Sequence, residues 1–190
     1  MSISFNNKDC LLIVDLQNDF CPEGALPVPE GDKTAEAINP YINKALEAKA
    51  LIAASRDWHP FNHCSFQSEG GIWPRHCVQG TRGAEFHHSL NLPKDALIIS
   101  KGTNPEKEAY SAFEDTGLEE ILKERGIKRV VVGGLALDYC VKASALDAKK
   151  AGFEVVLLKN ATRAVNVNPT DGEKALEVLS SNGVYIVENE

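Results

Sequence analysis

The sequence contains no apolar run of about 18 residues, the length that a membrane-spanning helix needs. It has no block of lysine and arginine, and its net charge of −7 disfavours a nucleic-acid or anionic-membrane partner. The N-terminal segment is largely polar and lacks an apolar core, so we expect no signal peptide. The five cysteines are odd in number and lack the spacing of a disulfide scaffold. They fit a reducing compartment such as the cytoplasm, with at least one thiol free for chemistry.

The chain does have enough apolar material for a core, since 43% of its 190 residues are hydrophobic and 25% are charged. This is the composition of an ordinary globular protein, and the length is that of one domain. We find no repeat or linker, and we therefore expect a single domain over residues 1–190.

Short apolar runs that do not alternate with polar residues are typical of strands buried on both faces of a parallel sheet. Such runs span residues 10–14, 50–54, 96–99, 130–132, 155–158 and 184–187. Apolar stripes with helical spacing lie between them: Ile38, Tyr41, Ile42 and Ala45; Leu118, Ile121 and Leu122; Val141, Ala145 and Ala148; Ala175, Val178 and Leu179. We expect Asn39 and Pro40 to begin the first helix. The alternation predicts βαβ units and an α/β fold.

Polar residues follow several of the predicted strands where each strand ends. Asp15 follows the first, Arg56 and Asp57 the second, Lys101 the third, and a glycine-rich turn leads from the fourth to Cys140. Ligands bind beyond the carboxyl ends of parallel strands, so these groups should converge at one edge of the sheet.

Cys140 stands at the start of a predicted helix, where the helix dipole lowers the pKa of a thiol. A carboxylate such as Asp15 can take the thiol proton, and the glycine-rich turn can direct backbone N–H groups at an oxyanion. Each residue also has an ordinary interpretation. Cys140 fits a small buried hydrophobe, Asp15 a turn cap, and Lys101 a surface residue.

Asp57 and His59 are two residues apart, so in an extended segment both face one side and can bind one ion. His76 is a natural third ligand, from the aperiodic, histidine-rich segment 56–95. Two imidazoles and one carboxylate describe a Zn, Fe or Mn site with open positions, although an Asp-x-His pair alone is weak evidence. His63 is a competing ligand, and Glu69 a weaker one. We expect this loop to lie outside the nucleophilic machinery.

Several long strings of the sequence resemble one family. They are residues 14–20 (VDLQNDF), 24–32 (GALPVPEGD), 56–60 (RDWHP), 73–79 (WPRHCVQ), 101–102 (KG), 109–113 (AYSAF) and 138–141 (DYCV). Together they resemble the isochorismatase-like cysteine hydrolases and, within them, the bacterial and archaeal nicotinamidases, also called pyrazinamidases.

The resemblance implies a three-layer α/β/α sandwich with a six-stranded, mainly parallel sheet. It implies a catalytic triad of Asp15, Lys101 and Cys140, and a divalent ion, Zn before Fe or Mn, on Asp57, His59 and His76. Phe20 and Trp73 would sandwich a pyridine ring. A cis peptide before Ala136 would aim the Ala136 N–H at the oxyanion, together with that of Cys140. Leu137 departs from the family pattern, where threonine is common, and puts local hydrogen bonding at this turn in doubt.

The implied activity is hydrolysis of nicotinamide, and of pyrazinamide, to the acid and ammonia through a cysteine thioester, in NAD salvage. The main alternative is another amidase of the family that acts on a carbamoyl or ureido substrate. An isochorismatase needs no cysteine nucleophile, so Cys140 argues against one, and the intact triad argues against a non-catalytic binding domain. The sequence leaves open the native metal, the preferred amide and whether the chain forms a homo-oligomer.

Overall fold

The computed structural model describes residues 3–188. Six parallel strands form one sheet in the order β3-β2-β1-β4-β5-β6. The strands are β1 (Asp9–Val14), β2 (Leu51–Asp57), β3 (Leu97–Lys101), β4 (Arg129–Leu135), β5 (Glu154–Arg163) and β6 (Tyr185–Val187). Every apolar run identified in the sequence lies at least partly in a strand, so the predicted parallel sheet is confirmed.

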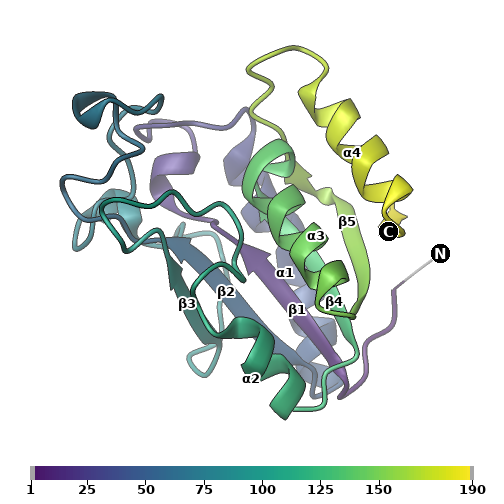
Figure 1. Ribbon diagram of the computed structural model, residues 1–190. Helices are drawn as coiled ribbons and strands as arrows, with labels where there is room; N and C mark the ends of the chain where they lie inside the picture. The colour runs from purple at the N-terminus through teal and green to yellow at the C-terminus, as the bar shows by residue number, and fades with distance from the viewer. Residues whose placement is uncertain (1–2, 189–190) are drawn as a thin grey trace.

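Helices cover both faces of the sheet (Figure 1). Helix α1 (Gly31–Glu47) packs on one face, and α2 (Leu118–Glu124), α3 (Lys142–Lys150) and α4 (Asp171–Ser181) pack on the other. Alternate residues of β1 divide between the two cores: Leu11 and Ile13 face α1, whereas Leu12 and Val14 face the other layer. The predicted three-layer α/β/α sandwich is therefore confirmed.

The predicted start of the first helix is wrong, because α1 begins at Gly31 and contains Pro40 in its interior. Pro40 has no N–H, so the carbonyl of Glu36, four residues earlier, receives no helical hydrogen bond from it. Both residues are exposed, so water can donate to that carbonyl instead. Asn39 does not cap the helix; its amide donates to the Ser89 carbonyl at 2.8 Å. Val178 of the fourth stripe is 42% exposed and contributes little to the core.

The strand order reverses at β1, which pairs with β2 on one side and β4 on the other. Such a switch point leaves a crevice at the carboxyl ends of the strands. The close approach of β4 to β1 requires glycine at position 134, where φ is +122° and a Cβ would lie 2.1 Å from the Val14 carbonyl oxygen. The turn that follows β4 is thereby held against the end of β1.

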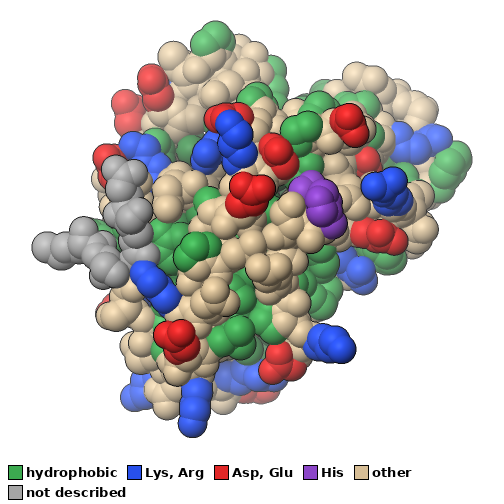
Figure 2. Space-filling model, turned by 180° about the vertical axis from the view of Figure 1, so that it is seen from behind, with side chains coloured by type: hydrophobic (Ala, Val, Ile, Leu, Met, Phe, Trp, Pro, Cys, Tyr) green, Lys and Arg blue, Asp and Glu red, His purple; other side chains and the backbone are tan. Residues whose placement is uncertain are grey.

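The described helices include none that is long and apolar enough to cross a membrane. Figure 2 shows Lys and Arg side chains interspersed with Asp and Glu on the face seen from behind, without a broad area of one sign. That face has no basic stripe of the kind that binds a phosphate backbone.

Candidate active site

Asp15, Lys101 and Cys140 meet at the switch point, as the positions of the strand ends predict. Asp15 follows β1 with a φ of +47°, Lys101 is the last residue of β3, and Cys140 lies on a π-helical turn between β4 and α3. Lys101 Nζ is 2.9 Å from Asp15 Oδ2 and 3.5 Å from Cys140 Sγ. A carboxylate oxygen of Asp15 and the sulfur lie within 4.8 Å of each other. All three side chains are buried.

Burial and the neighbouring charges together set the protonation states of Asp15, Lys101 and Cys140. Burial raises the pKa of Asp15 and of the Cys140 thiol, and the Lys101 ammonium opposes both shifts. Burial disfavours the charged form of Lys101, but Asp15 and Asp57 raise its pKa well above the ordinary value. Lys101 is therefore the permanent cation of the group, and Cys140 rests as a thiol.

One oxygen of Asp15 is available to accept a proton. Oδ1 accepts a hydrogen bond from the Ser55 hydroxyl at 2.7 Å. Oδ2 is buried and forms the ion pair with Lys101, and among the described residues it accepts from no other donor. A buried carboxylate oxygen that lies beside a thiol and is kept ionised by an ammonium is the arrangement that a general base requires.

Asp57, His59 and His76 form a second group, whose candidate ligand atoms all lie within 4.8 Å of one another. The Nε2 atoms of His59 and His76 are 3.4 Å and 3.8 Å from Asp57 Oδ2. The Nδ1 atom of His59 contacts the Gly102 carbonyl at 2.9 Å, and that of His76 the Pro74 carbonyl at 2.7 Å. A carbonyl only accepts, so Nδ1 carries the proton and Nε2 is left to bind a cation. The residues present fit a divalent ion.

Asp57 joins the two groups, which corrects our expectation that the metal-binding residues lie apart from the nucleophile. It is the last residue of β2 and pairs with Lys101 in the parallel register, rather than lying in the loop. Its Oδ1 accepts a hydrogen bond from Lys101 Nζ, whereas its Oδ2 faces the histidines. Burial raises the pKa of Asp57, but Lys101, His59 and His76 together outweigh burial and the net shift is downward, so Asp57 is ionised.

The two competing ligands lie outside the group of candidate ligand atoms found in the described part of the chain. His63 is fully buried, and both of its ring nitrogens have hydrogen-bond partners. Burial lowers its pKa to about 4, so the ring is neutral. Glu69 is exposed, in a short 3-10 helix (Gln67–Glu69). The arrangement thus favours His76 over both as the third ligand.

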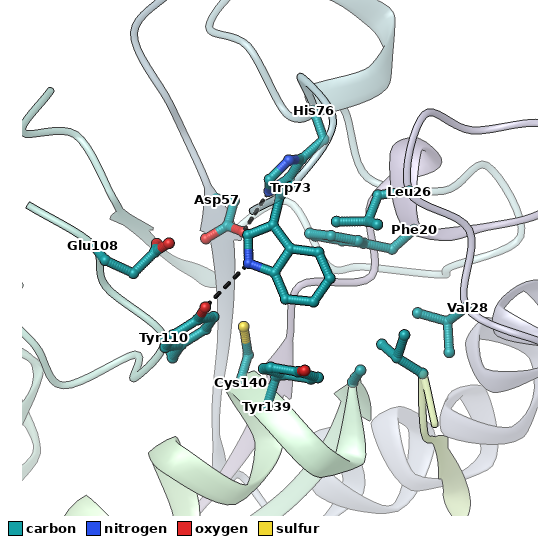
Figure 3. A pocket seen from close by; sticks show the side chains of 12 residues that line it. Phe20, Leu26, Val28, Asp57, Trp73, His76, Glu108, Tyr110, Tyr139 and Cys140 are labelled. Carbon is teal, nitrogen blue, oxygen red and sulfur yellow. Dashed lines mark hydrogen bonds and ion pairs between the residues drawn. The ribbon is translucent and has the colours of Figure 1, made fainter. Parts of the chain in front are cut away.

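A pocket opens above both groups (Figure 3). It encloses about 430 Å³, part of which is open to solvent. Trp73 forms one wall: its Nε1–H donates to the Tyr110 hydroxyl at 3.1 Å, and its ring meets the Tyr139 ring edge-on at 5.1 Å. The three substrate contacts predicted from the resemblance, Phe20, Trp73 and Ala136, all line the pocket. The full lining is Phe20, Leu26, Val28, Asp57, Trp73, His76, Glu108, Tyr110, Ala136, Tyr139, Cys140 and Val165.

The turn that carries Cys140 is tied to the loop that supplies Val165 to the pocket. The peptide between Leu135 and Ala136 is cis, as the resemblance implies, and within residues 3–188 the Ala136 N–H makes no backbone hydrogen bond. Asp138, buried beside the nucleophile, accepts from the N–H groups of Val165 and Asn166 at 2.9 Å and 2.8 Å. The cysteine turn and the loop that supplies Val165 to the pocket are therefore one unit.

Sequence reasoning assigned no role to several pocket residues. Tyr110 and Tyr139 stand within the motif strings, and their place beside the predicted site residues was the available signal. Glu108 and Val165 carry no such signal, because they reach the pocket through loops without periodicity.

Known proteins resemble the chain over its length. Residues 9–190 match the family model described as the Isochorismatase domain. The nicotinamidase of Escherichia coli (strain K12) is 41% identical, over 93% of this chain and 92% of that protein. The crystal structure of the pyrazinamidase of Pyrococcus horikoshii in complex with zinc has a TM-score of 0.92 and 56% identity, and covers 96% of this chain and 99% of its own. The crystal structure of PnC1 from L. infantum in complex with nicotinate has a TM-score of 0.89 and 37% identity, with 99% and 96% coverage.

These likenesses are not confined to the motif strings, since the family match runs from the first residue of β1 to the end of the chain. The strand order, both buried groups and the pocket lie within the matched residues. On this evidence the chain belongs to the isochorismatase family.

Proposed function

We propose that the protein hydrolyses nicotinamide, and also pyrazinamide, to the acid and ammonia, and so serves NAD salvage. One observation carries the proposal: a thiol beside a carboxylate and an ammonium shares an aromatic-walled pocket with two imidazoles and a carboxylate. The names of the relatives support it, since they include a nicotinamidase, a pyrazinamidase and a nicotinate complex. The reaction class is amide hydrolysis of a small, non-peptide substrate.

The chemistry falls to Asp15, Lys101 and Cys140. Asp15 takes the thiol proton through Oδ2 while the sulfur attacks the amide carbonyl carbon. Lys101 stabilises the thiolate at 3.5 Å and keeps Asp15 ionised. Asp15 returns the proton to the departing ammonia, which leaves a thioester on Cys140. Asp15 then accepts a proton from the water that attacks this thioester, and it gives that proton to the Cys140 sulfur as the C–S bond breaks and the acid leaves.

The backbone and the aromatic residues place the amide for this attack. The N–H groups of Ala136 and Cys140 would hold the oxyanion, and the Ala136 N–H has no competing backbone acceptor within the described residues. Phe20 and Trp73 both line the pocket and would sandwich the pyridine ring (Figure 3). The hydrogen bond to Tyr110 fixes the Trp73 ring in this position.

Asp57, His59 and His76 would hold one divalent ion. When bound, the ion would supply a Lewis acid that orients the ring nitrogen of the substrate. We propose zinc, because the neutral imidazoles and carboxylate suit it and the Pyrococcus horikoshii structure contains it. Iron and manganese suit the same donor set.

Three further features stay proposals. We propose that residues 1–190 act as one domain. The cytoplasm is the proposed compartment, because all five cysteines are unpaired thiols. We leave a homo-oligomer open, and we propose no nucleic-acid or anionic-membrane partner because the net charge is −7.

The proposal is tested by ammonia release from nicotinamide and from benzamide, which lacks the ring nitrogen. Wild-type protein should turn over nicotinamide faster by at least about 100-fold, and a chelator should abolish most of that advantage. His59→Ala should lose stoichiometric metal and lose the nicotinamide rate far more than the benzamide rate. Equal losses for both amides would contradict the ring-nitrogen role. A faster reaction with a carbamoyl or ureido substrate would favour the alternative amidase.

A further inference from the structure

His63 is the buried imidazole that neither proposed group uses. The Ser65 N–H donates to its Nδ1 at 3.2 Å, and the Ser65 hydroxyl lies 2.7 Å from the same atom. Its Nε2 lies 3.0 Å from the Lys107 carbonyl oxygen, which only accepts. The ring proton must therefore be on Nε2. A nitrogen that carries a proton and donates it to a carbonyl has no lone pair for a metal.

The face of the His63 ring packs on His59. The two ring centroids are 4.0 Å apart and the planes are tilted by 33°. Two other contacts restrict His59: the Phe66 ring meets it edge-on at 5.6 Å, and its Nδ1 is held by the Gly102 carbonyl. His63 thus blocks rotation of the His59 ring, which keeps Nε2 directed at Asp57 Oδ2.

His63 also connects the loop of metal-binding residues to the segment 104–110. Beside the bond from His63 to Lys107, the Cys64 N–H donates to the Pro105 carbonyl at 2.7 Å. The same segment reaches the nucleophile and the pocket wall, because the Ala109 carbonyl accepts from Lys101 Nζ at 3.2 Å. Its Tyr110 hydroxyl accepts from Trp73.

We propose that His63 is a positioning residue, not a metal ligand: it fixes the His59 ring and docks the segment 104–110 against the loop of metal-binding residues. The inference rests on the metal site of the proposed function. It does not depend on which amide is hydrolysed, because the role is one of holding a ligand in place. A group that orients a ligand in this way commonly changes metal affinity by about 10–100-fold.

The test measures metal binding directly. Zinc affinity is measured by competition with a chromophoric chelator, and coordination by the visible absorption of the cobalt-loaded protein, for wild type, His63→Ala and His63→Gln. Glutamine keeps a donor near the Lys107 carbonyl but removes the ring stack. His88→Ala is the matched control, since His88 is exposed and its ring contacts only that of His87 among the described aromatic pairs.

We expect His63→Ala to bind one ion about 10–100-fold more weakly, with an unchanged cobalt spectrum, and His63→Gln to bind with intermediate affinity. His88→Ala should match wild type. Unchanged zinc affinity in both His63 variants would overturn the inference. So would a changed cobalt spectrum or loss of stoichiometric metal in either variant, since these would make His63 a ligand. A protein that shows the expected metal results but releases no ammonia from nicotinamide would leave the inference standing and refute the proposed function.

Discussion

Gly102→Ala should weaken metal binding although residue 102 provides no side chain to the site. A Cβ at this position would lie 2.5 Å from Cε1 and 2.7 Å from Nδ1 of His59. Carbon atoms in contact are normally about 3.5–4.0 Å apart, so the ring must retreat by about 1 Å. That movement breaks the contact between Nδ1 and the Gly102 carbonyl and displaces Nε2 from Asp57. We expect zinc affinity to fall by at least about tenfold.

Gly126→Ala is the control that separates the clash with His59 from the free energy lost when an L-residue takes a left-handed backbone conformation. Gly102 has a φ of +62° and Gly126 a φ of +69°, but nothing lies within 4 Å of a Cβ at Gly126. Gly126→Ala should lose about 1–2 kcal/mol of unfolding free energy, because an L-residue resists the left-handed conformation, and Gly102→Ala should lose at least as much. Only Gly102→Ala should lose zinc affinity in a chelator competition. Equal zinc affinities in the two variants would refute the claim that the size of residue 102 sets the position of His59.

Three other variants test the nucleophilic group. Cys140→Ala should lower nicotinamide turnover by at least about 1,000-fold with zinc binding intact, as measured by ammonia release; retained turnover would refute the covalent mechanism. Asp15→Asn should lower kcat by at least about 100-fold, while nicotinamide still binds in calorimetry. A normal kcat with lost binding would make Asp15 a binding residue. Lys101→Met leaves Asp15 and Asp57 buried without their cation and should cost about 3–5 kcal/mol in chemical denaturation. The pKa values of these carboxyls would then exceed those in the unfolded chain. The folded variant would bind more protons, so its stability relative to wild type should recover as pH falls from 8 towards about 4, and a pH-independent deficit would contradict this.

The sequence predicted the meeting of Asp15, Lys101 and Cys140 because topology alone brings them together. Each stands at the carboxyl end of a strand, and parallel strands present those ends at one edge whatever their order. The same reasoning missed the contact between Asp57 and Lys101. That contact depends on β2 and β3 being neighbours in one particular register, which opposes these two residues. Apolar runs predict strands but do not state the register between them.

The aromatic pocket contacts Phe20 and Trp73 were predicted only through the resemblance. Trp73 and His76 lie in a segment whose backbone bonds follow no period, such as the bond from the Trp73 N–H to the Ser65 carbonyl at 3.0 Å. No spacing rule places such a loop. Pro40 shows the opposite error, because a sound local rule failed: the exposed face of α1 tolerates a missing N–H that a buried face would not.

Asp57 contacts both the nucleophilic group (Asp15, Lys101 and Cys140) and the metal-binding histidines, which limits how experiments can separate the two groups. Its Oδ1 contacts the ammonium that serves the thiol, and its Oδ2 faces the two histidines, so one carboxylate belongs to both groups. A substitution at Asp57 removes a metal-binding residue and a partner of Lys101 together, and its effect on turnover cannot be assigned to either. Within residues 3–188, the side chains of His59 and His76 form no hydrogen bond or ion pair with Asp15, Lys101 or Cys140; their polar link to these residues runs through Asp57. The histidines are therefore the positions at which substrate orientation can be removed while the nucleophile keeps its base and its cation.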